Sequence, residues 1–163
     1  VQSEQGILGG IFGGKKNNFS KCKKYLNCFC KSVFYFGNVS KASSAKLLSN
    51  FLSLLTTTSV IEFLKSAKKL DIDIKLLCDV ARLGSGNSGA LDRIANKAIK
   101  GNYKGYVFSV DNTFKDLNYI NDLVSDMPNA NNLVKTAKSF YKNASKKGYG
   151  NLLVSELIGK EKY

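Results

Sequence analysis

The sequence predicts a mainly α-helical protein: a bundle of about six helices built on one long first helix, preceded by a short strand–helix–strand unit. Three observations lead to this prediction. Apolar residues recur at helical spacing for about thirty residues after Gly37. Patterns typical of strands occur before that glycine, and the single proline, Pro128, stands between two later helical patterns. With 163 residues and 44% hydrophobic side chains, the chain is large enough to bury such a core.

Residues 1–36 are predicted to form the strand–helix–strand unit. The apolar, glycine-rich segment 7–14 predicts a strand closed by a turn, and segment 32–36 predicts a second strand. Apolar side chains recur at helical spacing between them, which predicts a helix over residues 18–30. Because one such unit cannot cover both faces of a sheet, we expect it to be the tail of a larger α/β domain.

The chain from residue 37 onward is predicted to be helical. Its first helix should run to Leu70 and be apolar on nearly all sides, so several neighbours should cover it. The run Thr56–Ser59 within this helix predicts either a kink or a close contact with another helix. Asp71 is expected to cap the next helix, which should end at Gly84. Later helices are predicted over about residues 88–99, 111–127, 130–147 and 152–158.

The net charge of +13 admits two interpretations. It could serve a polyanionic partner, such as nucleic acid or a phosphorylated cofactor. It could also reflect solvated lysines on every helix, and this is favoured because the lysines are scattered over the whole chain. Clusters such as Lys68–Lys69 and Lys146–Lys147 are not interleaved with aromatic residues, as base-stacking surfaces are. Nucleic acid is therefore not expected as a partner.

Membrane and metal chemistry are not expected either. The chain has no run of about 18 apolar residues, so we expect no membrane-spanning helix. The chain has no histidine, and Cys22, Cys28, Cys30 and Cys78 lack paired C-x-x-C spacing, so we expect no metal site. Reduced thiols in an intracellular protein explain these cysteines better.

The segment Gly84–Gly89 has the G-x-G-x-x-G spacing of dinucleotide-binding loops. Such a loop needs a strand before it, and here a predicted helix precedes it, so we interpret the segment as a turn between two helices. Gly84 would end the first helix, and Asn87 or Ser88 would cap the second. The turn could also line a substrate pocket with Ser85, Asn87 and Ser88.

Lys46 and Asn50 are the strongest candidates for catalytic chemistry. They stand four residues apart near the start of the long predicted helix, a spacing that places both side chains on one face. An amine beside an amide suits proton transfer to and from a bound hydroxyl group. The competing interpretation is that Lys46 is one more exposed helix lysine, and spacing alone favours it.

Five segments share their order and character with one known family. Gly37, Lys46 and Asn50 fit the pattern G-x-x-G-x-G-x-x-x-K-x-x-x-N, with Ser40 and Ala42 in place of its two inner glycines. The other four segments are Gly6–Gly14, Gly84–Ser88, Phe108 with Lys115-Asp116-Leu117, and residues 128–150, after which Leu153 stands where the family often has an aspartate. Together they resemble the β-hydroxyacid dehydrogenase family, which includes 3-hydroxyisobutyrate dehydrogenase, over essentially the whole chain.

The resemblance implies an NAD(P)-dependent oxidoreductase that interconverts a small β-hydroxyacid and its semialdehyde or keto form. It implies that Lys46 is the general acid and base, that Asn50 orients the substrate, and that Ser43 is a further substrate contact. The residues implied to contact the cofactor are Phe108, Lys115 and Asp116. Residues 1–36 would be the end of a Rossmann-type domain, and NAD or NADP would be bound mainly by a part of that domain that precedes Val1.

Residues 37–163 would then form the substrate and oligomerisation domain. A long helix that is apolar all round predicts a contact with a second copy of the chain, unless the preceding domain covers it. We expect a cytoplasmic protein, with the mitochondrial matrix as the alternative. Two other functions stay open: a non-catalytic helical module that binds nucleic acid through its charge, and a degenerate family member kept for assembly, as Ser40 and Ala42 suggest.

Overall fold

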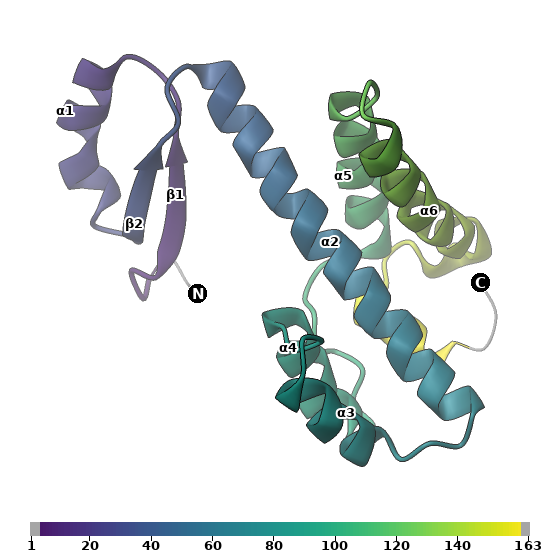
Figure 1. Ribbon diagram of the computed structural model, residues 1–163. Helices are drawn as coiled ribbons and strands as arrows, with labels where there is room; N and C mark the ends of the chain where they lie inside the picture. Colours follow the sequence, from purple (N-terminus) through teal and green to yellow (C-terminus); the bar gives the residue numbers. More distant parts are fainter. Residues whose placement is uncertain (1–3, 161–163) are drawn as a thin grey trace. The chain divides into compact units, whose positions relative to one another are not determined.

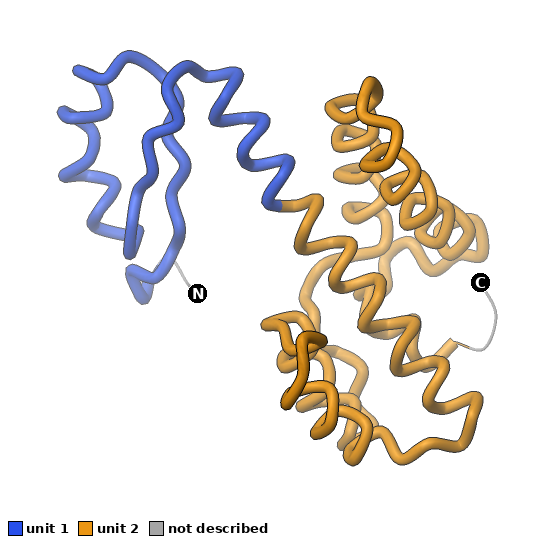
Figure 2. Tube along the Cα trace, viewed as in Figure 1, with its two compact units in different colours: residues 1–49 blue, residues 50–163 orange. Residues whose placement is uncertain are grey.

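The computed structural model describes residues 4–160 of the chain. The chain divides into two compact units, unit 1 with residues 1–49 and unit 2 with residues 50–163 (Figure 2). The long helix α2 (Val39–Lys69) contributes its first part to unit 1 and the rest to unit 2. The predicted domain boundary after residue 36 stays a prediction.

Unit 1 begins with two parallel strands joined by one helix. Strands β1 (Leu8–Phe12) and β2 (Cys30–Tyr35) pair in parallel with Ile11 opposite Phe34, and α1 (Lys16–Leu26) connects them. Parallel strands need such a crossover, because the second strand must start at the same edge as the first. The predicted strand–helix–strand unit is confirmed, although α1 ends at Leu26 because Cys30 already begins β2.

The small core of unit 1 is aromatic. The ring centroids of Phe12 and Phe19 lie 5.3 Å apart, and those of Phe19 and Tyr35 lie 5.2 Å apart in a stacked arrangement. Gly13 lets the turn after β1 approach the start of α2: a Cβ atom at this position would lie 2.5 Å from the Cβ atom of Ala42. The glycine is therefore required by close packing.

Helix α2 is continuous from Val39 to Lys69. The side-chain oxygen of Asn38 caps it by accepting the backbone N–H of Lys41 at 2.9 Å. The run Thr56–Ser59 produces no break in the helix, so the predicted kink is wrong. The other alternative, a close helix contact, is confirmed, because the hydroxyl oxygens of Thr58 and Tyr141 in α6 (Pro128–Ala144) lie 2.8 Å apart.

Helices α3 (Ile74–Leu83) and α4 (Gly89–Ala98) follow as a pair. Asp73 caps α3 by accepting the N–H of Leu76 at 2.8 Å, so the predicted cap at Asp71 is wrong. Asp71 instead adopts a φ of 54° in the turn that ends α2. Ser88 caps α4 by accepting the N–H of Leu91 at 3.1 Å, one of the two predicted alternatives.

Helix α5 (Val110–Leu123) forms a second pair with α6, and in Figure 1 the two pairs lie on opposite sides of the C-terminal part of α2. A π-helical turn, η1 (Ser145–Tyr149), continues α6, and a 3-10 helix, η2 (Val154–Gly159), follows. The largest fully buried side chains in the core of unit 2 include Ile61, Leu64, Leu91, Ile94, Leu117, Ile120, Val134, Tyr141 and Leu157. The predicted mainly helical bundle on a long first helix is confirmed.

Helix α2 is less evenly covered than its sequence predicts. Leu54, Ile61 and Leu64 are buried, whereas Leu52 is 69% exposed. By length and composition alone, α2 could cross a membrane, so the lack of an uninterrupted apolar run did not exclude such a helix. Leu54, Ile61 and Leu64 pack into the core of unit 2, so we interpret this part of α2 as a core helix.

Candidate functional site

Asn50, Lys115 and Asp116 come together where α2 meets α5 in unit 2. The side-chain Nδ2 of Asn50 donates to Oδ2 of Asp116 at 3.0 Å, and Nζ of Lys115 lies 3.5 Å from Oδ1 of the same carboxylate. The Asp116 side chain is 16% exposed, so these contacts are partly shielded from water. Asn50 and Asp116 are 66 positions apart in the sequence, and the fold brings these three predicted site residues together.

Helix α5 places Asp116 at the edge of its buried side. The hydroxyl of Ser109 caps the helix by accepting the N–H of Asn112 at 3.3 Å. The buried positions of α5 recur at helical spacing: Val110, Thr113, Leu117 and Ile120. Because Asp116 directly precedes the fully buried Leu117, the packing of the helix also sets where the Asp116 carboxylate lies.

Ser43 and Lys46 lie on the part of α2 that belongs to unit 1, and both side chains are exposed. Asn50 is half-buried and belongs to unit 2. Since α2 is continuous, the helical repeat places positions 43, 46 and 50 on one face of this helix. The catalytic and substrate-binding roles of these side chains stay predictions.

Phe108 is positioned by the C-terminal segment of the chain. Its carbonyl oxygen accepts the N–H of Val154 at 2.9 Å, and the next residue, Ser109, forms an isolated antiparallel bridge with Leu153. This bridge is a small exception to the prediction that the chain is all helix after residue 37. The half-buried Phe108 side chain thus stands just before α5, and Asp116 follows about two helical turns later.

The segment Gly84–Gly89 is a turn between two helices, as predicted, because helix α3 precedes it where a dinucleotide-binding loop would need a strand. Ser85 and Asn87 are exposed, and a pocket-lining role for them stays a prediction. Near this turn Arg82 joins α3 to α4, with its Nε 3.0 Å from Asp92. The hydrogen bond to Asp92 is the main reason that the pKa of Arg82 is raised.

The cysteines have free thiols in the structure: Cys22, Cys28, Cys30 and Cys78. Cys78 is fully buried, and burial raises the pKa of its thiol. Within residues 4–160, no three His, Cys, Asp or Glu side chains form a group that could hold a metal ion.

A lysine cluster that the sequence prediction did not assign lies at the C-terminal end of α2. Lys65, Lys68 and Lys69 of this helix line one pocket together with Lys160. The sequence could have indicated part of this cluster. Lys68 and Lys69 follow Lys65 by three and four residues, so the three side chains are neighbours on the surface of the helix. The contribution of Lys160 depends on tertiary folding.

Residues 40–159 match the family described as NAD-binding of NADP-dependent 3-hydroxyisobutyrate dehydrogenase. This chain belongs to that family. The match confirms the resemblance found in the sequence, and it confirms NAD(P) as the cofactor of the family. It begins one position after the start of α2 and ends with η2, so it includes the Asn50–Asp116 contact.

The curated relatives of this NAD-binding family are distant and longer. The chain is 24% identical to the cytokine-like nuclear factor N-PAC of Anopheles gambiae over 149 residues, which cover 91% of the chain and 26% of the relative. It is 25% identical to human mitochondrial 3-hydroxyisobutyrate dehydrogenase over 157 residues, which cover 90% of the chain and 46% of that protein. The chain therefore spans about a quarter to a half of the length of these relatives.

A solved structure supports the same fold. The crystal structure of 3-hydroxyisobutyrate dehydrogenase from Salmonella typhimurium matches with a TM-score of 0.80 at 23% identity. The match covers 98% of this chain and 56% of that chain. The helical arrangement built on α2 is therefore one that the 3-hydroxyisobutyrate dehydrogenase family uses.

Proposed function

We propose that this chain is the C-terminal part of an NAD(P)-dependent oxidoreductase that interconverts a small β-hydroxyacid and its semialdehyde or keto form. The observation that carries the proposal is the contact of Asn50 with Asp116 in a chain of the 3-hydroxyisobutyrate dehydrogenase family. The contact holds the side-chain amide of Asn50 on one face of α2. The family pattern places Lys46 on the same face of this helix.

The residues present suit a hydroxyacid and a nicotinamide cofactor. A primary amide offers two N–H donors and a carbonyl acceptor, and one N–H of Asn50 is directed at Asp116. That contact fixes the plane of the amide, so Asn50 can hold the hydroxyl or carboxylate of a substrate in one orientation. Lys115 and Asp116 would lie at the cofactor side, with Phe108 before the same helix.

Proton transfer is the role proposed for Lys46. NAD or NADP supplies the hydride chemistry when bound, and the protein supplies the proton path. In oxidation the Nζ atom of Lys46 would accept the hydroxyl proton, and in reduction it would return a proton to the carbonyl oxygen. Ser43, one turn earlier on α2, would contact the substrate.

The test is Lys46→Ala in the full-length protein, with Lys41→Ala as the matched control. Lys41 is an exposed lysine on the same helix but points to another face, so the control removes the same charge. We expect Lys46→Ala to lower kcat by roughly 10²–10⁴ with a smaller change in KM, as for lost acid–base catalysis. Near-normal turnover in Lys46→Ala, or an equal loss in Lys41→Ala, would contradict the assignment.

A second measurement concerns the chain by itself. We propose that most of the dinucleotide is bound outside residues 1–163, so this chain should show neither turnover nor micromolar affinity for NAD(H). Calorimetric titration of the chain with NADH would measure that affinity directly. Tight binding would show that the cofactor site is built from these residues alone.

A non-catalytic assembly role is the second candidate. Two observations favour it: similarity to a relative named as a nuclear factor, and the replacement of two family glycines by Ser40 and Ala42. Leu48 and Leu52 on α2 are 47% and 69% exposed, and we infer that this helix contributes a contact between copies of the chain.

Sedimentation of the chain and of its Leu52→Glu variant would test this contact. Assays of the full-length protein against small hydroxyacids would separate the catalytic role from the assembly role.

A further inference from the structure

A concave site lies at the C-terminal end of α2. Three lysines of α2 and one lysine that follows η2 line a pocket of about 540 Å³. This volume lies within the usual range for small-molecule sites, about 300–1,000 Å³. The other lining residues are Glu62, Ser66, Ile158 and Gly159.

The charges around this pocket are unbalanced. Among the described lining residues, the lysines at positions 65, 68, 69 and 160 contribute four positive charges and Glu62 contributes one negative charge. Nζ of Lys65 lies 3.8 Å from Glu62. The C-terminal end of a helix adds roughly half a negative charge, which leaves a clear positive excess. Burial is the main reason that the pKa of Lys65 is lowered, and a bound anion would oppose that shift.

Contacts with aromatic rings hold two of the lysines at the rim. Nζ of Lys68 donates to the hydroxyl of Tyr103 at 3.2 Å, and Nζ of Lys160 lies 5.2 Å from the ring centroid of Tyr149. Gly159 makes room for Tyr103, because a Cβ atom there would lie 3.1 Å from a ring carbon of the tyrosine. The rim is therefore partly ordered before any ligand binds, which lowers the entropy cost of binding.

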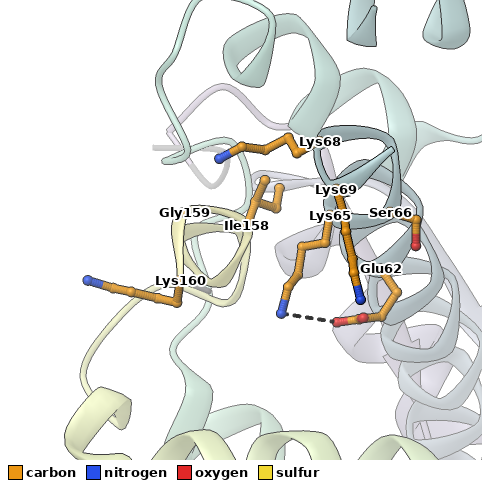
Figure 3. Close-up of a pocket in the computed structure, with 8 residues that line it drawn as sticks. All are labelled: Glu62, Lys65, Ser66, Lys68, Lys69, Ile158, Gly159 and Lys160. Atoms are coloured by element: carbon orange, nitrogen blue, oxygen red, sulfur yellow. Dashed lines mark ion pairs between the residues drawn. The ribbon is translucent and has the colours of Figure 1, made fainter. Parts of the chain in front are cut away.

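The lysines extend in two directions from the centre of the pocket. In Figure 3, Lys65 and Lys69 run toward Glu62, while Lys68 and Lys160 extend away from it. Lys65 and Lys69 are therefore the two lysines on the same side of the pocket, and the other two raise the positive potential around it.

We propose that this pocket binds a small phosphate-bearing ligand, with Lys65 and Lys69 contacting its phosphate oxygens. The site is separate from the Asn50–Asp116 contact, because Lys65 follows Asn50 by fifteen residues on α2, about 22 Å along the helix axis. The proposal therefore does not depend on dehydrogenase activity. A small ligand fits better than a nucleic acid, since lysines already cover the rings of Tyr103 and Tyr149 that could have stacked bases.

Titration calorimetry of the chain with inorganic pyrophosphate, in about 50 mM salt to limit screening, tests the proposal. The pocket variant is Lys65→Gln/Lys69→Gln, and the matched control is Lys135→Gln/Lys142→Gln, which removes two exposed lysines of α6. We expect one pyrophosphate per chain. Affinity should fall about tenfold or more in the pocket variant and by less than about twofold in the control.

Two further variants keep the test informative if the double variant unfolds. Lys69→Gln changes an exposed side chain and should by itself weaken pyrophosphate binding. Tyr103→Phe removes the hydroxyl group that accepts a hydrogen bond from Lys68. Each should weaken pyrophosphate binding by about two- to fivefold with no loss of helical circular dichroism. Equal weakening in the pocket and control variants, or no one-site binding up to about 5 mM, would overturn the proposal.

Discussion

Unit 1 and unit 2 bury apolar surface to very different degrees. Among the described apolar residues of unit 1, Cys30 and Ala42 are buried, whereas Phe34 of its sheet is 58% exposed. Unit 2 buries apolar side chains from its part of α2 and from each of α3 to α6. Since apolar burial is the main favourable term in folding, the helical unit contains the source of its own stability. A two-stranded sheet is marginal without further packing, so unit 1 is expected to be the weaker of the two.

Hydrogen exchange should show the largest difference between the units. Amides in the middle of α5 and α6 should exchange only on global unfolding, because these helices carry fully buried residues such as Leu117 and Tyr141. Amides of β1 and β2 should exchange on the order of a thousandfold faster, equivalent to about 4 kcal/mol. Exchange measured by NMR or mass spectrometry that is equally slow in both units would contradict the comparison.

Substitutions on α2 should separate its buried side from its exposed side. Leu64 is 0% exposed, so Leu64→Ala should destabilise the chain by about 2–5 kcal/mol through lost packing and a cavity. Leu52→Ala, on the same helix at 69% exposure, is the control and should change stability by less than about 0.5 kcal/mol. Urea unfolding followed by circular dichroism measures both losses of stability, and similar losses would show that the two sides of α2 are equally buried.

The buried tyrosine of unit 2 predicts a loss of stability at alkaline pH. Burial raises the pKa of Tyr141 well above its usual range. The unfolded chain would release this proton near pH 10, while the folded chain would keep it. The contribution to stability is therefore complete below about pH 10 and is lost at higher pH, by about 1.4 kcal/mol per pH unit.

Tyr141→Phe should remove this part of the decrease in the free energy of unfolding with rising pH. At neutral pH the same variant should cost about 1 kcal/mol, because the hydrogen bond with Thr58 is lost. Tyr119→Phe is the control, since Tyr119 is 55% exposed and should leave the slope unchanged. Urea unfolding at several pH values between about 8 and 11 gives the slopes, and an identical slope in Tyr141→Phe would exclude the buried phenol as the cause.

Local patterns predicted the helices better than their ends. The long helix was predicted because apolar spacing and the lack of proline both act along a continuous stretch of chain. The cap of α3 was assigned to Asp71, but Asp73 accepts the N–H of Leu76. Two aspartates two positions apart both suit a cap, and the choice depends on where the turn after α2 ends. Of the two alternatives predicted for Thr56–Ser59, the close contact with another helix is the one observed, because Thr58 contacts Tyr141 of α6 within a continuous α2.

The sequence by itself determined the order of the elements, the turn at Gly84–Gly89 and the family pattern around Lys46 and Asn50. These depend on neighbours within a few positions, where spacing and backbone preference act directly. Tertiary structure decided that Asp116 holds Asn50 and that Lys160 joins three lysines of α2. Such contacts link residues far apart in the chain, and they exist only because helix packing brings distant faces together, which no local pattern encodes.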